Sequence, residues 1–298
     1  MEEKRKKAVV LAGLSGCMWG SIGLFVHLLG SFGIRSIELT VGRFLVSAVI
    51  LGLCLTVKRK LLVIRLRDLP LFAAAGICCL LFFNVSYGIA IEKASMSVAA
   101  VMLYTSPALV MLISAVVFRE ALTIQKGAAV ILAIAGCGFV SGIMSGFLAY
   151  PPSAYLWGFG AAAGYASYSI VAGILLKRHH PATVLFYAFL FAGAAGCLFA
   201  DLGSVAKAVA AEPAAGLWLV CAAFVCNIFS YLCYNLALKS MEASRVAVVA
   251  SVEPAVASVL GVVILGEHMD GFGVIGVLCI FGAILILNQP EKRGSNER

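Results

Sequence analysis

The chain contains ten apolar runs, each close to the length that an α-helix needs to cross a lipid bilayer. The hydrocarbon core of a bilayer is about 30 Å thick, and a helix of about 20 residues spans it. Because backbone groups in hydrocarbon find no water, each run must satisfy its own hydrogen bonds as a helix. The sequence therefore predicts an all-α integral membrane protein with ten transmembrane helices. The expected spans are residues 8–29, 37–57, 69–90, 96–117, 121–144, 154–176, 182–200, 214–238, 244–265 and 270–288.

The amino-acid composition excludes a water-soluble domain. Apolar residues make up 62% of the chain, charged residues only 12%, and the mean hydropathy is +1.05. A soluble domain carries about 25% charged residues. The basic opening MEEKRKK resembles the start of a signal peptide, but the apolar run that follows exceeds the usual length of about 7–15 residues and lacks a cleavage pattern. We expect this run to remain as the first span.

The motifs of common enzymes and metal sites are absent from the sequence. All ten cysteines lie inside apolar runs, where a thiol packs as a small hydrophobe. No CxxC pair or His/Cys cluster has the spacing of a metal site. No HExxH, GxSxG or phosphate-binding loop occurs, and no filter-like loop indicates a channel. The sequence predicts no enzymatic activity, no cofactor and no metal.

The basic residues alternate between the predicted loops. With a cytoplasmic amino terminus, 18 of the 22 lysines and arginines fall in inner segments and adjoining helix ends, and the outer loops hold only Arg35, Lys93 and Lys207. This distribution follows the positive-inside rule and predicts a multi-pass protein of the cytoplasmic membrane with both termini cytoplasmic. Arg43 lies inside a span. The net charge of +8 reflects topology and attraction to anionic membrane lipid, and we expect no nucleic-acid partner.

The sequence contains an internal repeat with a period of 147 residues. The segment SPALVMLISAVVFRE ends at Glu120 and EPAVASVLGVVILGE ends at Glu267, so Pro107 pairs with Pro254. One period holds five predicted spans, and an odd number makes the second copy enter the membrane from the opposite side. Such inverted repeats occur in many secondary transporters. A gene duplication with structural consequences alone is the alternative interpretation.

These paired segments resemble the signature of EamA-type transporters in the drug/metabolite transporter superfamily. The resemblance covers roughly residues 8–288 and implies a 5+5 fold around a central cavity, with one five-helix repeat at 8–144 and the other at 154–288. It also implies a secondary transporter that exports a small organic metabolite, an amino acid or related compound, by alternating access. The expected partners are this substrate, lipid and, as a candidate coupling ion, protons. The alternative function is a non-transporting membrane scaffold or receptor.

Glu253 is the candidate functional residue with the strongest physical argument. It lies about 18 Å from the outer end of its predicted span at about 1.5 Å per residue, and a charge at that depth costs about 2.5–3.5 kcal/mol. Three roles remain open: a proton carrier, a binder of a substrate amine, or a partner of Arg43 in an ion pair. Pro107 and Pro254 each remove a backbone donor, so we expect both helices to bend there.

Two other spans carry faces that mix amides, phenols and rings. Asn84 and Tyr87 share a face of the third span, and Asn227 and Tyr231 share one of the eighth. Such faces suit an amphipathic solute, although hydrogen bonds between helices use the same residue types. The expected substrate-binding residues are Glu253, Asn84, Tyr87, Asn227, Tyr231, Tyr104, Trp19 and Tyr168.

Two further patterns give structural expectations. Gly16 and Gly20 form a GxxxG motif in the first span, and Gly160 and Gly164 form another in the sixth. Both motifs predict close helix contacts. The glutamates at the ends of the two repeated segments are expected to be solvated charges at helix ends.

Overall fold

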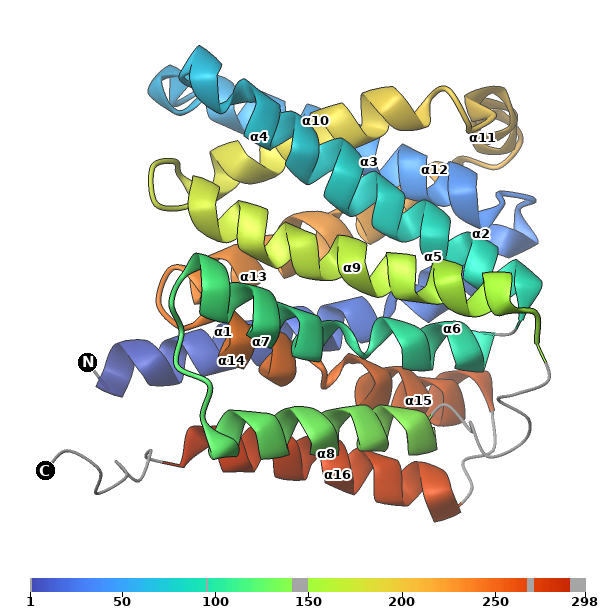
Figure 1. Ribbon diagram of the computed structural model, residues 1–298. Coiled ribbons are helices and arrows are strands. Elements are labelled where there is room, and N and C mark those ends of the chain that lie inside the picture. The colour runs from blue at the N-terminus through green and yellow to red at the C-terminus, as the bar shows by residue number, and fades with distance from the viewer. Residues whose placement is uncertain (1, 95, 141–149, 267–270, 290–298) are drawn as a thin grey trace, which may run out of the picture.

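The computed structural model describes residues 2–94, 96–140, 150–266 and 271–289. Within these ranges the chain is helical, with no β-strand. The long helices run roughly along one common direction and stack in layers (Figure 1). Within these described ranges, every predicted span overlaps a helix or consecutive helical segments. The main segments are α1 (Glu2–Gly20), α2 (Ile22–Ser31), α3 (Ser36–Thr56), α4 (Leu69–Ala73), the π-helix η3 (Ala74–Leu81), α5 (Phe82–Lys93), α6 (Met96–Leu103), α7 (Ser106–Val117), α8 (Ile124–Val140), α9 (Pro152–Leu175), α10 (Pro181–Gly196), α11 (Leu202–Ala211), α12 (Pro213–Ala222), the π-helix η6 (Ala223–Phe229), α13 (Ser230–Leu238), α14 (Ala243–Ala250), α15 (Glu253–Leu265) and α16 (Gly271–Asn288).

Seven helical stretches in the described residues are long and apolar enough to cross a membrane. Four further apolar helices are shorter, among them α8, α10 and α16. The outside of the bundle exposes large apolar side chains, including Val116 at 81% and Ile131 at 71%, and an extended surface of this kind needs lipid around it. The all-α membrane fold is thus confirmed, whereas the ten-span topology stays a prediction.

Helices from the two predicted repeats pack against one another in a regular pattern. α3 packs on α10, and α8 packs on α16. α1 contacts α13 and α15, while α9 contacts α5 and α7. If the two 147-residue units are exchanged, the α3–α10 and α8–α16 pairs map onto themselves. The α1–α13 pair is exchanged with α9–α5, and the α1–α15 pair with α9–α7. The packing is therefore the one that a twofold relation between the halves requires.

Two of the long helices are interrupted at equivalent positions. The break between α6 and α7 falls at residues 104–105, and the break between α14 and α15 falls at residues 251–252, 147 residues further on. Pro107 and Pro254 follow directly, in the first turn of the next helix. Proline is tolerated there because the first amides of a helix have no carbonyl partner within it. Each interruption leaves two half-helices that meet inside the bundle.

A second irregularity also occurs once in each half. The π-helices η3 and η6 lie in the third and eighth predicted spans, and neither has a sequence signal that we could use to predict it. Wide turns of this kind are rare and are found frequently at functional sites.

The junction of α14 and α15 lies close to α1 because residues 16 and 20 are glycines. A Cβ atom at Gly16 would lie 2.4 Å from the carbonyl oxygen of Ala250, and one at Gly20 would lie 2.7 Å from that of Glu253. In the other motif a Cβ at Gly164 would lie 3.0 Å from Phe83, whereas Gly160 makes only ordinary contacts. The predicted close contacts are confirmed at three of the four positions.

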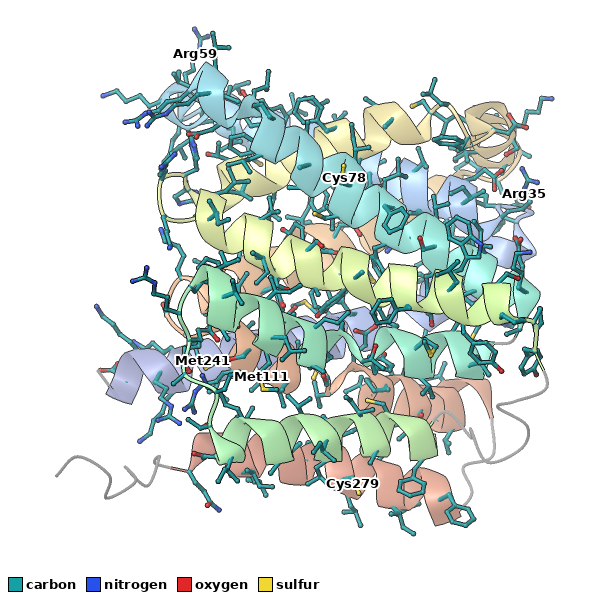
Figure 2. The ribbon with its side chains drawn as sticks, viewed as in Figure 1. Arg35, Arg59, Cys78, Met111, Met241 and Cys279 are labelled. Carbon is teal, nitrogen blue, oxygen red and sulfur yellow. The ribbon has the colours of Figure 1, made fainter. Side chains whose placement is uncertain are left out.

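The start of α1 and the end of α16 lie on the same side of the bundle. Arg5 donates a hydrogen bond from Nη2 to the carbonyl oxygen of Leu287 at 3.0 Å. Arg59 and Met241 lie on this side in Figure 2, whereas Arg35 lies on the opposite side. α3, which begins next to Arg35 and ends shortly before Arg59, therefore runs from one side of the bundle to the other.

Candidate functional site

Glu253 is the first residue of α15 and lines a small cavity inside the bundle. The free volume is about 10 Å³, about the least that holds one water molecule. In this conformation the cavity is too small for an organic solute, so binding requires helices around it to move. The other lining residues are Leu103, Tyr104, Ser106, Tyr165, Ala247, Ala250 and Ser251.

The cavity surrounds the Glu253 carboxylate with aromatic hydroxyls rather than with cations. Tyr104 lines the same cavity, and Tyr87, Tyr165 and Tyr231 lie within electrostatic range of the carboxylate. No lysine or arginine in the described part of the chain forms an ion pair with Glu253. A carboxylate in this setting is suited to gain a proton or to bind a cationic ligand.

The possible ion pair between Arg43 and Glu253 is absent from this conformation. Arg43 instead donates from Nη1 to Oδ1 of Asn227 at 3.3 Å. The reason is the arrangement of the helices: α3 faces η6, which carries Asn227, and α1 packs against both η6 and α15. Arg43 is only 4% exposed and so does not extend to the outer surface.

An aromatic cluster connects the two charged residues. The Trp19 indole donates from Nε1 to the carbonyl oxygen of Cys226 at 3.2 Å. Its ring centroid lies 4.8 Å from that of Tyr231 and 5.9 Å from that of Tyr165, and Tyr165 also lines the Glu253 cavity. The Tyr168 ring lies 5.2 Å from Tyr231. Trp19, Tyr168 and Tyr231, which the sequence predicted, therefore form one aromatic group together with Tyr165.

The predicted site residues differ in how they lie relative to Glu253 and Arg43. Tyr104 lines the Glu253 cavity, Tyr87 lies within electrostatic range of Glu253, and Asn227 accepts a hydrogen bond from Arg43. Asn84 uses its Nδ2 to donate to the carbonyl oxygen of Leu80 at 2.8 Å, one turn back in its own helix. Its amide therefore stabilises the wide turn of the helix in this conformation.

Glu120 has a structural role that its position in the sequence did not indicate. Its carboxylate accepts hydrogen bonds from the backbone amides of Ala243 at 2.7 Å and Ser244 at 3.3 Å, and from the Ser114 hydroxyl at 2.9 Å. Glu120 thus caps the start of α14, where the first amides need acceptors, and the expectation of a solvated charge is wrong. Glu267, its counterpart, lies outside the described residues. No local pattern around Glu120 indicated this cap, because the amides that it serves lie 123 and 124 residues further along the chain.

Replacement of Glu120 by Gln is expected to lower the stability of the protein by about 1–2 kcal/mol, the usual effect of weakening a helix cap. A glutamine has one acceptor oxygen and no charge, so it cannot serve all these donors. Thermal unfolding of the purified protein in detergent measures the effect. Glu92→Gln is the control, because Glu92 is exposed on α5. Equal midpoints for the two variants would contradict the capping role.

A cluster of ion pairs around Glu242 also joins helices near the start of α14. Glu242 binds Lys126 at 3.1 Å and Arg245 at 2.7 Å through Oε2. Burial pushes the pKa of Glu242 upward, but hydrogen bonds from Arg245 and Lys126 outweigh that effect and leave the pKa below its ordinary value. The carboxylate therefore stays charged at neutral pH and holds α8 to α14.

An apolar exterior and a carboxylate deep in the bundle are features that membrane transporters share, and comparison with known proteins identifies the class. The family model described as "EamA-like transporter family" matches the chain twice, at residues 6–142 and 152–289. The chain belongs to this family. It is a multi-pass protein of the cell membrane that transports a small molecule.

Curated relatives agree with this assignment. A Bacillus subtilis protein described as "Uncharacterized transporter YxxF" is 25% identical over 95% of this chain and 90% of its own. An "Uncharacterized transporter" of Archaeoglobus fulgidus is 26% identical over 89% and 92%. A solved structure titled "Crystal structure of protein" covers 95% of this chain and 96% of its own, with a TM-score of 0.80 and 19% identity. That likeness concerns the fold alone.

Proposed function

We propose that the protein is a secondary transporter that exports a small organic metabolite, an amino acid or related compound, by alternating access. Ten transmembrane helices form two inverted five-helix repeats, residues 8–144 and 154–288, with both termini in the cytoplasm. The substrate site lies between the repeats, at the cavity that Glu253 lines.

The paired helix interruptions are the observation that carries this proposal. Two half-helix junctions 147 residues apart, close to the middle of the bundle, are the feature that inverted-repeat carriers use to build a central site. The double match to the family model and the packing of the halves support the repeat. The hydrogen bond between Arg5 and Leu287 supports termini on one face.

Glu253 has the central role in this mechanism. Its carboxylate binds either the amine of the substrate or a proton, and the surrounding tyrosines offer hydroxyls and ring faces to the rest of the solute. The narrow cavity corresponds to a closed state, and movement of the half-helices opens it first to one side of the membrane and then to the other.

Solute counterflow in proteoliposomes tests the proposal. Purified protein is reconstituted, and a panel of labelled amino acids and related metabolites is followed with and without a pH gradient. We expect saturable counterflow of at least one amino acid or close derivative, above the level in protein-free liposomes. The proposal fails if the panel shows no saturable flux with protein whose folding has been verified, or if flux rises linearly with concentration, as it does through a channel.

A further inference from the structure

Arg43 and Asn227 present two hydrogen-bond donors that find no acceptor in the described part of the chain. Within these residues, Arg43 Nε and Asn227 Nδ2 are both buried without a partner, although the side chains are joined by the bond from Nη1 to Oδ1. Arg43 is 4% exposed and Asn227 is 2% exposed. Among the residues that the structure describes, no carboxylate forms an ion pair with Arg43.

The chemistry of this pair favours an anion with two oxygens. A buried cation without a counter-charge is strongly unfavourable, and each unpaired buried donor adds its own desolvation cost. The planar guanidinium presents parallel N–H groups that match a carboxylate, and the neighbouring amide N–H adds another donor. A ligand carboxylate would therefore satisfy the charge and the free donors together.

Arg43 lies at nearly the same depth as Glu253. Arg43 is about 10 Å from the start of α3 on the Arg35 side, and Glu253 is about 15 Å from the start of α14 on the Met241 side (Figure 2). For a core about 30 Å thick, the two differ by only about 5 Å along the bundle. Both therefore lie near the middle of the predicted membrane.

Short contacts link the two residues across α1. Trp19 binds the carbonyl oxygen of Cys226, the residue next to Asn227, and Gly20 approaches the backbone of Glu253. Tyr231 lies within electrostatic range of both Arg43 and Glu253. A guanidinium and a carboxylate thus flank one aromatic group without pairing with each other.

The charges of Arg43 and Glu253 each occur in only one of the two repeated halves. The position 147 residues after Arg43 is Leu190, and the position 147 residues before Glu253 is Ser106. The junctions, prolines and wide turns recur in both halves, whereas each charge occurs once. Features required for the movement of both halves should recur, while features that recognise a single asymmetric solute need not.

We propose that Arg43 and Asn227 bind a carboxylate of the transported solute, while Glu253 binds its cationic group. This inference rests on the proposed transport function and narrows its substrate class to zwitterions. The aromatic cluster around Trp19 contacts the apolar part of such a solute.

Acetate is the probe for the anion site, because it is the smallest carboxylate and needs no side-chain pocket. The thermal midpoint of the purified full-length protein in detergent is measured against sodium acetate at constant ionic strength, with sodium chloride as the balance. We expect acetate to raise the midpoint of the wild type. In Arg43→Gln the half-maximal concentration should rise at least about tenfold, the loss expected for a charge-assisted hydrogen bond.

Two further variants keep this test decisive. Arg43→Lys retains the charge but not the planar fork and should weaken acetate binding several-fold even if Arg43→Gln does not fold. Ser47→Ala removes a neutral hydrogen bond to the carbonyl oxygen of Ala223 between the same two helical segments and should leave acetate binding unchanged. Absence of stabilisation by acetate up to 100 mM, or equal stabilisation of wild type and Arg43→Lys, would overturn the site.

Counterflow separates failure of this site from failure of the transport function. If labelled putrescine, which has no carboxylate, moves as fast as the amino acids and Arg43→Gln does not slow it, the anion site is wrong while transport stands. If acetate binds through Arg43 but no solute in the panel moves, the anion site stands and the transport proposal falls.

Discussion

Glu253→Gln is expected to reduce saturable flux of the transported solute about 10- to 100-fold. Glutamine matches the size of glutamate, but it neither carries a charge nor takes up a proton. The substitution therefore removes a charge-assisted hydrogen bond to a substrate amine or blocks proton coupling, and either loss amounts to about 1.5–3 kcal/mol. If Glu253 carries the coupling proton, the dependence of flux on the pH gradient should also disappear in Glu253→Gln.

The Glu253→Gln substitution is also expected to affect the thermal stability of the protein. A carboxylate within the membrane costs free energy when charged, so the glutamine protein should unfold at the same or a higher temperature than the wild type. Glu38→Gln is the matched control. Glu38 is also inside the bundle, with 0% exposure, but it is bound by Arg35 at the start of α3. Its substitution should lower stability and leave flux intact, and full activity of Glu253→Gln at every pH would refute the functional role.

Gly16→Ala is expected to destabilise the protein by about 1–3 kcal/mol, the range for overpacking a well-packed contact. The new Cβ would lie 2.4 Å from the Ala250 carbonyl oxygen and 2.7 Å from Val252 Cγ1. A backbone atom cannot rotate away, so α1 and the junction of α14 with α15 must separate. This shift is transmitted to the Glu253 cavity, and both the unfolding temperature and the flux should fall.

Gly13→Ala provides the control on the same helix. Apart from the neighbouring backbone of α1 itself, no atom of the described residues lies within 4 Å of a Cβ built at Gly13. Alanine is also favoured over glycine in a helix by about 1 kcal/mol. This variant should therefore be as stable as the wild type or slightly more stable. Equal unfolding temperatures for the Gly13 and Gly16 variants would show that the close contact of α1 is not required.

The helices were predictable because their cause is local. Each apolar run must form a helix in lipid whatever it packs against, and the prolines at 107 and 254 indicated where two of them change direction. The small helix α11 was not predicted. Asp201 is its N-cap, and the Asp201 side chain accepts a hydrogen bond from the backbone amide of Ser204. This capping signal lies in a segment that the sequence pattern indicated as a connection.

The partners in the candidate site were not predictable, because they depend on tertiary packing. The sequence indicated that Arg43 and Asn227 were unusual in their spans, but their contact requires α3 to face η6. The pairing of Asp68 with Arg178 at 3.1 Å and with His179 at 2.9 Å joins segments more than 100 residues apart. Residue type and spacing identified candidates, whereas only the fold shows which of them meet.

The interruption between α14 and α15 has a consequence for the charge of Glu253. Because the helix stops and starts again, its carboxylate occupies the first turn of a new helix deep inside the bundle. The aligned peptide dipoles give that end a partial positive charge, which stabilises an anion by about 0.3–1 kcal/mol and by up to about 2 kcal/mol when partly buried. The backbone thus supplies part of the compensation that an arginine would otherwise provide, and this leaves the guanidinium across the aromatic cluster available to a ligand.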